Sequence, residues 1–381
     1  MRNYDYIFAG NGLAALLTLR EMVVSNQFLD KTILIIDPDE KKINDKTWCF
    51  WEKPNGDFDS VVSKKWDKAL FANKYFSRVF NMKPYEYKQI ESLDFYNDML
   101  KILRTQKNIT FLKTQVADFQ DKNTHVEVQT QEGNFSCKKL FNSILKPKEI
   151  LSQDKYPLLQ QHFIGWKIKT NKPAFDPEIA TFMDFSVAQK GNTRFMYVLP
   201  VSPHEALLEY TLFSPHLLPE KEYEDEIVNY LQSKNITGYE VISKEQGNIP
   251  MTCYPFWKKN TKNVVNIGSA GGWTKASTGY TFRNSAKKSK KLIQFLLQKN
   301  DFRTYYSTNK FWFYDLLLLD ILHHKNHLGN TIFSSMFKTA KPEKIFKFLD
   351  EETNIIEDLY VIWQCPKKPF LIALFNRIFR Q

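Results

Sequence analysis

The N-terminal stretch has small and acidic side chains at spacings that suit a phosphate-linked cofactor. An apolar run at 6–9 leads into Gly10, Gly12 and Ala15, and a helical pattern continues to about residue 24. Gly10 permits a tight turn, Gly12 lets the backbone approach a pyrophosphate without a Cβ in the way, and Ala15 lets the helix lie close to the strand. The start of such a helix offers free N–H groups and a positive dipole end to phosphates.

A second apolar run at 32–36 ends at Asp37, which is placed to accept hydrogen bonds from a ribose. The order of strand, glycine turn, helix, strand and acid predicts dinucleotide binding, and the alternative is a βαβ unit that binds nothing. FAD is favoured over NAD because this unit opens a long chain that carries a second glycine cluster late in its sequence. Leu13 and Ala14 complete the predicted cofactor-binding stretch.

The late glycine cluster follows a short apolar strand at 263–267. Gly268, Ala270 and Gly271 stand at the end of that strand, and Gly279 and Tyr280 come before a basic helix at 283–299. Small residues between a strand and a helix allow a second close approach to the phosphates and ribityl chain of a flavin. An ordinary tight turn is the alternative.

Glu209 is the candidate for acid chemistry, and it lies among leucines in a predicted strand at 205–213. If the side chain points inward, loss of water raises the pKa of the carboxyl, which then holds a proton near neutral pH and can donate it. If it points outward, it is an ordinary surface glutamate. The alternation of the strand leaves both orientations open.

Aromatic residues gather shortly after the first βαβ unit. Trp48, Phe50 and Trp51 fall within one short window. Such side chains bury readily in a core, and they can also form the wall of a site for a flat or polyene-like ligand. Both interpretations stay open from the sequence.

The elements around these residues predict an α/β protein. We expect an FAD-binding, Rossmann-like domain of the glutathione-reductase type, an antiparallel-sheet substrate domain, and a helical C-terminal region. The predicted strands of that sheet are 162–170, 181–185, 193–200, 205–213 and 239–249, and a helix is predicted at 219–234. Another strand is expected at 141–145, after a hairpin turn at 132–134. The predicted domains are 1–80, 106–150 and 255–300 for FAD, 81–105 and 151–254 for substrate, and 301–381 for the helices.

Composition indicates a large globular protein with anionic partners. The chain has 381 residues, 53 Lys and Arg against 42 Asp and Glu, and a net charge of +11. No basic run with interleaved aromatics is present, so we expect a membrane surface rather than nucleic acid as the partner. We expect no signal peptide and no membrane span, and a cytoplasmic protein bound peripherally to the inner face of the membrane. A basic amphipathic helix predicted at 369–381 suits a bilayer interface or packing on the protein itself.

Metal and disulfide chemistry are not predicted. The four cysteines are scattered without metal or redox spacing, as expected of a reduced protein. His323, His324 and His327 cluster at the end of a helix predicted at 311–327, but no acidic or thiol ligand stands near them at a suitable spacing.

In order along most of the chain, several segments are similar to those of the flavin-dependent lycopene β-cyclases of bacterial carotenoid pathways, and more distantly to the plant cyclases. Residues 10–15 match the flavin fingerprint, and 45–51 resemble a Thr-Trp-x-Phe segment. Residues 194–200 and 207–211 are similar to the cyclase motif. Residues 245–250 resemble a Glu-x-Gly-x-(Leu/Ile)-Pro element, and 268–272 with 278–280 resemble the second flavin segment.

This resemblance implies a non-redox, acid-catalysed cyclisation of the ψ ends of lycopene to β-rings, giving β-carotene through γ-carotene. Glu209, the first acid of the cyclase motif, would protonate C2. The 5,6 double bond would then attack the cation at C1, and loss of a C6 proton would complete the ring. The resemblance further implies that reduced FAD stabilises the cation, that NAD(P)H is the reductant, and that a flavin base or Glu209 takes the last proton.

The resemblance also suggests substrate contacts. Trp48, Phe50, Trp51 and Tyr280 become candidates for polyene contact or cation–π support, and Tyr210 occupies the second acid position of the cyclase motif. Lycopene and related ψ-ended carotenoids would be drawn from a membrane.

Two departures from the family pattern concern function. Tyr210 replaces the second acid of the cyclase motif, so the acid role falls on Glu209 alone. Lys275 and Ala276 replace a usual His-Pro pair, which leaves the shape of the loop beside the isoalloxazine open.

Two other functions compete with the cyclase. An FAD-dependent monooxygenase or reductase acting on an isoprenoid or aromatic substrate would consume NAD(P)H stoichiometrically with product. A carotenoid-binding protein with a degenerate flavin pocket would show no turnover. The segment around Glu209 favours the cyclase.

Overall fold

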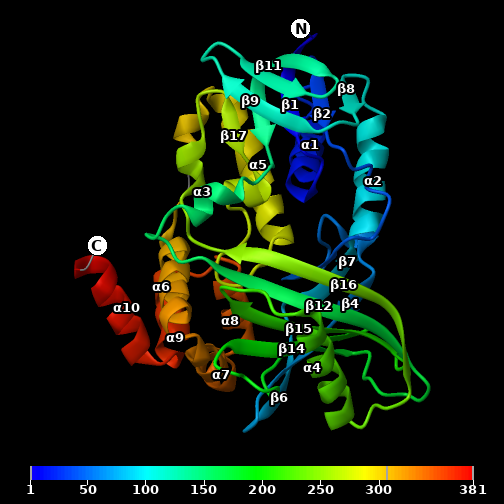
Figure 1. The fold of residues 1–381 in the computed structure, drawn as a ribbon, viewed down its shortest axis with the longest axis vertical. Helices are drawn as coiled ribbons and strands as arrows, with labels where there is room; N and C mark the ends of the chain where they lie inside the picture. Colours follow the sequence, from blue (N-terminus) through cyan, green and yellow to red (C-terminus); the bar gives the residue numbers. More distant parts are fainter. Residues whose placement is uncertain (1, 306–307, 380–381) are drawn as a thin grey trace.

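The computed structural model describes residues 2–305 and 308–379, and its N-terminal part is a mixed sheet covered by helices (Figure 1). Parallel strands β8 (Ile109–Leu112), β2 (Ile33–Ile36), β1 (Arg2–Ala9), β11 (Gly133–Asn142) and β17 (Val264–Asn266) form its body. Antiparallel β10 (Val126–Thr130) and β9 (Val116–Asp121) extend one edge. Central β1 and β2 are buried apolar runs, as expected for parallel strands covered by helices.

Helices α1 (Leu13–Ser25), α2 (Ser92–Arg104) and α5 (Phe282–Gln298) pack beside this sheet. The helix α1 lies against α5, where Thr18 Oγ1 is 3.1 Å from Ser289 Oγ. Asn26, in the left-handed conformation, ends α1. The carboxyl ends of β1 and β17 and the start of α1 therefore meet at one edge of the sheet.

A second sheet forms the lower half of Figure 1. Its order is β16 (Tyr239–Met251), β12 (Leu159–Thr170), β15 (Glu205–Ser214), β14 (Thr193–Pro200), β13 (Ile179–Asp184), β5 (Lys68–Ala72) and β6 (Ser77–Asn81). All pairs are antiparallel except β13 with β5. One face carries α4 (Glu220–Ser233) over an apolar layer that includes Leu208 and Tyr210. The other face turns toward the aromatic core and the C-terminal helices.

A small third sheet joins the two halves. Its strands are β3 (Thr47–Glu52), β7 (Glu86–Glu91) and β4 (Lys64–Trp66). Helices α6 (Lys310–His324), α7 (Gly329–Thr339), α8 (Pro342–Leu349) and α9 (Ile355–Gln364) pack beside the second sheet, and α10 (Lys367–Phe379) packs on the outer side of α6. Short α3 (Pro147–Leu151) links the halves. Within the described residues, no helix is both long and apolar enough to cross a bilayer.

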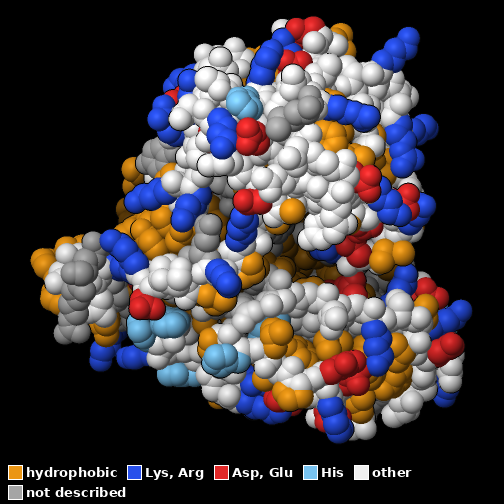
Figure 2. Space-filling model, turned by 45° about the horizontal axis from the view of Figure 1, so that its top comes forward, with side chains coloured by type: hydrophobic (Ala, Val, Ile, Leu, Met, Phe, Trp, Pro, Cys, Tyr) orange, Lys and Arg blue, Asp and Glu red, His pale blue; other side chains and the backbone are white. Residues whose placement is uncertain are grey.

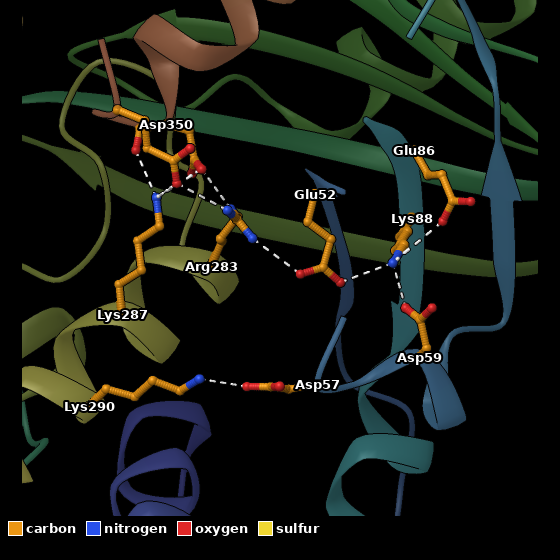
Figure 3. A network of polar contacts seen from close by, with 10 residues as sticks. Glu52, Asp57, Asp59, Glu86, Lys88, Arg283, Lys287, Lys290 and Asp350 are labelled. Atoms are coloured by element: carbon orange, nitrogen blue, oxygen red, sulfur yellow. Dashed lines mark hydrogen bonds and ion pairs between the residues drawn. The ribbon is translucent and has the colours of Figure 1, made fainter. Parts of the chain in front are cut away.

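A network of buried charges ties the third sheet to α5 and to the end of α8 (Figure 3). The Nζ atom of Lys88 lies 3.0 Å from a Glu52 oxygen and 2.5 Å from an Asp59 oxygen. Arg283 then joins Glu52 at 3.1 Å to Asp350 at 2.6 Å. Because Lys88 has no exposed side-chain surface, each charge in this network depends on its partners.

The predicted fold class is confirmed, with small differences in the elements. The predicted strand at 193–200 has the observed bounds, and β12, β13, β15 and β16 differ from prediction by a few residues. The separate strand predicted at 141–145 is wrong, because β11 runs from Gly133 to Asn142 as one long partner of both β1 and β10. Strands β5 and β6 come from the predicted segment 1–80 but lie in the second sheet.

The terminal helix has two different sides. Ala373 is buried against α6, and Leu374 packs with it, whereas Leu371, Phe375 and Ile378 are exposed. Arg377 binds Asp320 through two nitrogens, at 2.6 and 2.5 Å, so its charge is paired with α6. Residues 380 and 381 of the predicted helix lie outside the described residues.

Candidate functional site

The glycine turn after β1 has the geometry that the sequence predicts for this motif. Gly10 has φ +102°, and a Cβ there would lie 2.1 Å from Ser143 Oγ, so only glycine fits. Gly12 precedes α1 with no side-chain cap, and a Cβ at Gly12 would meet nothing within 4 Å. The first N–H groups of α1 thus face open space at the helix start, where phosphate binds well.

The second glycine cluster lies against the start of α1. A Cβ at Gly268, which has φ +58°, would lie 3.1 Å from Ala14 Cβ. Gly279 has φ +74°, and a Cβ there would lie 2.3 Å from Gln161 Oε1. The start of α1 and the second glycine cluster, which are more than 250 residues apart in the sequence, therefore form one wall with few side chains on it. We call it the glycine wall.

Asp37 closes β2 beside this turn. One carboxylate oxygen accepts a hydrogen bond from the Asn11 backbone N–H at 2.5 Å, and the other accepts one from Asp39 N–H at 2.8 Å. Lys41 Nζ stands 3.9 Å from the carboxylate. The Asp37 side-chain oxygens at this position can accept hydrogen bonds from a sugar bound beside the start of α1.

Several buried polar atoms near the glycine wall have no hydrogen-bond partner among the described residues. They are Asn11 Oδ1, Gln161 Oε1, Thr278 Oγ1 and Ser285 Oγ. Because an unpartnered buried polar group costs about 1–3 kcal/mol, such atoms mark positions where a ligand restores the missing contacts. Their number and polarity fit an extended dinucleotide rather than a purely apolar ligand.

One cavity of about 420 Å³ connects this wall to the second sheet. Its lining includes Gly12, Leu13, Ala14, Gly268, Gly279 and Tyr280 from the predicted cofactor residues, and Trp48 and Glu209 from the predicted substrate and acid residues. The cavity therefore places Glu209 and the glycine wall in a single site. Another cavity of about 620 Å³ lies between α6, α10 and residues 150–160, and no predicted site residue in the described chain lines it.

Glu209 points inward, into the first cavity. Strand β15 directs Leu207, Glu209 and Phe213 to the aromatic core and Leu208 and Tyr210 to the α4 side. Burial raises the pKa of the Glu209 carboxyl well above its usual value, and the charge of Glu245 and a hydrogen bond with it raise that pKa further. At neutral pH such a carboxyl can hold a proton and donate it.

Glu245 of β16 was not predicted as a site residue. The central strand β12 presents Gly165 between the two acids, since Gly165 pairs with Glu209 on one side and with Glu245 on the other. Thr47 donates a hydrogen bond from Oγ1 to Glu245 Oε2 at 2.8 Å. The one available signal was Glu245 as the first residue of the Glu-x-Gly-x-(Leu/Ile)-Pro element, but the partner of that acid depends on strand order.

Tyrosines surround the two acids. Tyr197 pairs with Glu209 across β14 and β15, and its hydroxyl lies 3.1 Å from the Tyr280 hydroxyl. The Tyr87 hydroxyl is 3.4 Å from the Tyr280 hydroxyl. Burial raises the pKa of each of these three phenols well above its usual value, so they stay neutral, and all three line the cavity.

Three aromatic residues predicted to contact substrate do not line the cavity described here. Phe50 is buried and stacks on Phe282 with ring centroids 4.7 Å apart. Trp51 lies behind Tyr280, with ring centroids 4.7 Å apart. Tyr210 is on the opposite face of the sheet, because its neighbour Glu209 faces the cavity and side chains alternate.

Three of the predicted cofactor residues support the site from behind. Ala15 is fully buried in α1. Ala270 is buried, and Gly271 donates its N–H to the Ile267 carbonyl at 3.1 Å. A Cβ at Gly271 would lie 2.2 Å from the Asn266 carbonyl oxygen, so glycine allows the turn itself.

The loop that departs from the family pattern is anchored by an ion pair. Lys275 Nζ lies 2.9 Å from an Asp315 oxygen of α6 and 3.1 Å from a Glu351 oxygen, and Ala276 packs in the aromatic core. Lys275 N donates to the Tyr280 carbonyl at 3.0 Å, and Gly279 N donates to the Lys275 carbonyl at 2.9 Å. The side chain thus points to the C-terminal helices and fixes the loop that carries Tyr280.

No cluster of three or more His, Cys, Asp or Glu side chains that could hold a metal ion occurs within residues 2–305 and 308–379. His323 and His324 lie with ring centroids 5.0 Å apart at the end of α6. His327 follows the helix.

Family comparison identifies the class of protein that this site belongs to. The family model described as lycopene cyclase protein matches residues 5–374, so the chain belongs to the lycopene cyclase family. A relative described as lycopene beta-cyclase, from Paracoccus sp. (strain N81106 / MBIC 01143), is 29% identical over 136 residues. That match spans 33% of this chain and only 34% of the relative.

Solved structures show the fold. A geranylgeranyl bacteriochlorophyll reductase-like protein from Thermoplasma acidophilum has a TM-score of 0.63 at 12% identity, with 100% of both chains covered. A flavoprotein/dehydrogenase from Cytophaga hutchinsonii has a TM-score of 0.65 at 12% identity, covering 99% of this chain and 100% of that one. A flavin-dependent brominase has a TM-score of 0.59 at 12% identity over the whole of both chains. The α/β fold with its second sheet is thus that of a flavoprotein.

Proposed function

We propose that this chain is a lycopene β-cyclase that converts ψ end groups of lycopene to β-rings with Glu209 as the general acid. The observation that carries the proposal is the Glu209 carboxyl of raised pKa, which lines the same cavity as the glycine wall in a chain of the lycopene cyclase family. Burial and Glu245 raise the pKa of this carboxyl, which supplies the proton that an unactivated double bond needs.

The cavity also suits a cationic intermediate. Tyr197 and Tyr280 present aromatic rings beside Glu209, and Trp48 lines the same cavity. Ring faces attract a cation, and a hydrocarbon substrate offers no hydrogen bonds of its own. After Glu209 releases its proton, its carboxylate is a negative charge in the same cavity and stabilises the positive charge on the end group.

The residues of the glycine wall would hold FAD. Gly12, Leu13 and Ala14 would face the pyrophosphate, Asp37 the ribose, and Gly268 and Gly279 the ribityl side, and the unpartnered polar atoms there fit such a ligand. Reduced FAD, with NAD(P)H as its reductant, would supply negative charge beside the cation without net redox change. The similarity of the fold to a flavoprotein/dehydrogenase and to a flavin-dependent brominase supports this cofactor.

The substrate would be drawn from a membrane by the last two helices. Exposed apolar side chains cover the outer sides of α9 and α10, and apolar atoms surround the C-terminal end in Figure 2. They are Ile355, Ile356, Leu359 and Trp363 of α9, and Leu371, Phe375, Ile378 and Phe379 of α10. Lys367 stands 4.2 Å from the Trp363 ring centroid, a pairing of basic and aromatic groups that suits an anionic interface.

The test of the cyclase is an anaerobic assay with lycopene in liposomes, FAD and NADPH. We expect β-ringed product far in excess of NADPH consumed, and a fall of at least about 100-fold with Glu209→Gln, because the amide cannot donate the proton. Product that tracks NADPH one for one, or an oxygenated or saturated carotenoid, would identify a monooxygenase or reductase instead. An active Glu209→Gln protein would move the acid to another residue.

The test of the membrane surface is flotation with anionic liposomes. The double variant Leu371→Ser, Phe375→Ser is expected to float several-fold less than the unsubstituted protein, because it removes apolar area from α10. The matched control Val24→Ser, Leu29→Ser changes two equally exposed apolar residues of the N-terminal part and is expected to float normally. Equal flotation of both variants would exclude α10 as the docking helix.

A further inference from the structure

Glu209 and Glu245 are held together by the architecture of the second sheet. They come from β15 and β16, which are not neighbours, and both pair with Gly165 of the strand between them. A Cβ at Gly165 would lie 2.8 Å from Glu209 Cγ and 3.2 Å from Glu245 Cγ. The absence of a side chain at Gly165 therefore leaves the space in which the two acids meet over β12.

Glu245 lies close enough to Glu209 in this space that its charge and a hydrogen bond between the two carboxyls raise the pKa of Glu209. A hydrogen bond between two carboxyl groups requires a proton on one of them, because two carboxylates have only acceptors. Among the described residues no Lys or Arg forms an ion pair with either acid. Two negative charges so close together without a counter-ion are strongly disfavoured, so the pair carries one proton in its resting state.

The surroundings determine which acid holds that proton. Thr47 Oγ1 donates to Glu245 Oε2 at 2.8 Å, and a donated hydrogen bond favours the ionised form of the carboxyl that accepts it. Glu209 lies opposite Tyr197, and among the described side chains only Glu245 is a hydrogen-bond partner of its carboxyl. The raised pKa of Glu209 and the hydrogen bond from Thr47 to Glu245 therefore both favour placing the proton on Glu209.

We propose that Glu245 is a second catalytic residue, which takes up the proton lost from C6 and returns it to Glu209 through their shared hydrogen bond. This inference rests on the proposed cyclase function, and it assigns the last proton acceptor to the chain itself. Both acids line the cavity, so both carboxyls can reach a substrate there.

The proton balance closes within the pair. Glu209 gives its proton to C2, and the π electrons of the 1,2 double bond form the new C2–H bond and leave a cation at C1. The π electrons of the 5,6 double bond form the C1–C6 bond and move the cation to C5. The C6–H electrons then form the 5,6 double bond, and the proton passes to Glu245. The pair regains one proton, and no electron is gained or lost.

The other titratable groups at the pair are neutral near physiological pH or paired elsewhere. Burial raises the pKa of the Cys49 thiol of β3 and of the phenols Tyr87, Tyr197 and Tyr280 well above their usual values. Asp45 and Lys46, which also line the cavity, pair with each other at 2.8 Å, and Lys41 pairs with Asp39 at 2.9 Å. Glu209 and Glu245 are therefore the groups of the cavity that can exchange a proton with each other.

The experiment is the pH profile of the anaerobic cyclase assay with Glu245→Gln. The unsubstituted protein is expected to give a bell-shaped profile, because activity needs one proton on the pair. In Glu245→Gln the acid limb is lost, since no second carboxyl remains to be protonated. The alkaline limb moves to lower pH, since Glu209 loses its negative neighbour, and the maximal rate falls about 100-fold.

Two further variants keep the test decisive. Thr47→Val removes the donor to Glu245 and keeps both acids, so the acid limb is expected at higher pH. Glu240→Gln changes an exposed glutamate of the same strand and is expected to keep the original profile. Thermal unfolding of each variant shows that it is folded.

A Glu245→Gln profile equal to the original, or an unshifted acid limb in Thr47→Val, overturns the role of Glu245 while the cyclase stands. Loss of cyclisation with NADPH-linked products in the unsubstituted protein overturns the cyclase itself.

Discussion

Two groups of buried or partly buried carboxyls in this molecule differ in their partners. In the network of Figure 3, each acid faces a base: Lys88 meets Glu52 and Asp59, and Arg283 meets Glu52 and Asp350. In the cavity, Glu209 faces another acid, Glu245, and tyrosines. The first group joins elements, and the second leaves a proton available.

The pKa shifts of Asp59 and Glu209 reflect this difference, whereas at Asp350 burial outweighs Lys287 and Arg283 and raises the pKa to about 6. Burial alone would raise the pKa of Asp59, but hydrogen bonds from Lys65 and Lys88 outweigh burial and hold that pKa below its usual value. For Glu209, burial, the charge of Glu245 and their hydrogen bond all raise the pKa. Two basic partners thus keep the partly buried Asp59 ionised, whereas a second acid beside Glu209 favours a proton donor.

The largest effect on folding is expected when the network of Figure 3, in which the acids have basic partners, is broken. Lys88→Met would leave Glu52 and Asp59 without their buried partner, and we expect a loss of about 3–5 kcal/mol in the free energy of unfolding. Urea unfolding measures it. A loss of less than about 1 kcal/mol would show that the network does not hold the third sheet in place.

The matched control is Lys290→Met in the same region. Lys290 lies 2.6 Å from Asp57, but both side chains are 49% exposed, so the pair is screened by water. We expect a loss of less than about 1 kcal/mol.

A smaller effect is expected at Glu209 and Glu245, where a substitution changes how the free energy of unfolding depends on pH. Because the folded state raises the pKa of Glu209, it binds that proton more tightly than the unfolded chain does. This contribution to stability is complete below the ordinary glutamate pKa and is lost as the pH rises through the raised value. Glu209→Gln removes the contribution, so its free energy of unfolding should fall less than that of the unsubstituted protein between pH 5 and pH 8.

Unfolding curves of both proteins at several pH values measure this difference. If the free energies of unfolding of the two proteins changed with pH in the same way, Glu209 would not have a raised pKa in the folded protein. Since the glutamine also removes the repulsion between two acids, we expect the variant to be at least as stable at pH 8 although it is inactive.

Local patterns predicted much of the fold. The alternation at 193–200 gave a strand with the observed bounds, because an antiparallel strand between two partners buries every second residue on each face. The glycines and apolar runs at the start gave β1, α1 and β2 in order. The strand predicted at 141–145 failed because pairing with β1 and β10 extends β11 over residues that do not look like one strand.

The candidate site was only partly predictable for the same reason. Glu209 was found from its apolar neighbours, but its direction and its partner Glu245 depend on β12 lying between two strands that are distant in sequence. Aromatic spacing suggested ligand contacts for Phe50, Trp51 and Tyr210. Packing on Phe282, on Tyr280 and on the α4 side places them outside the cavity wall.

The sequence by itself determined the local elements: the turn at Gly10, the helix after it, and the strand around Glu209. These depend on contacts between residues close in the chain, which spacing and composition specify. Only the tertiary structure decided that Gly165 lies between Glu209 and Glu245. It also decided that Lys275 pairs with Asp315 and Glu351, and that the buried Lys88 pairs with Glu52. Charge and pKa depend on which groups surround a side chain in space, and those groups come from distant parts of the chain.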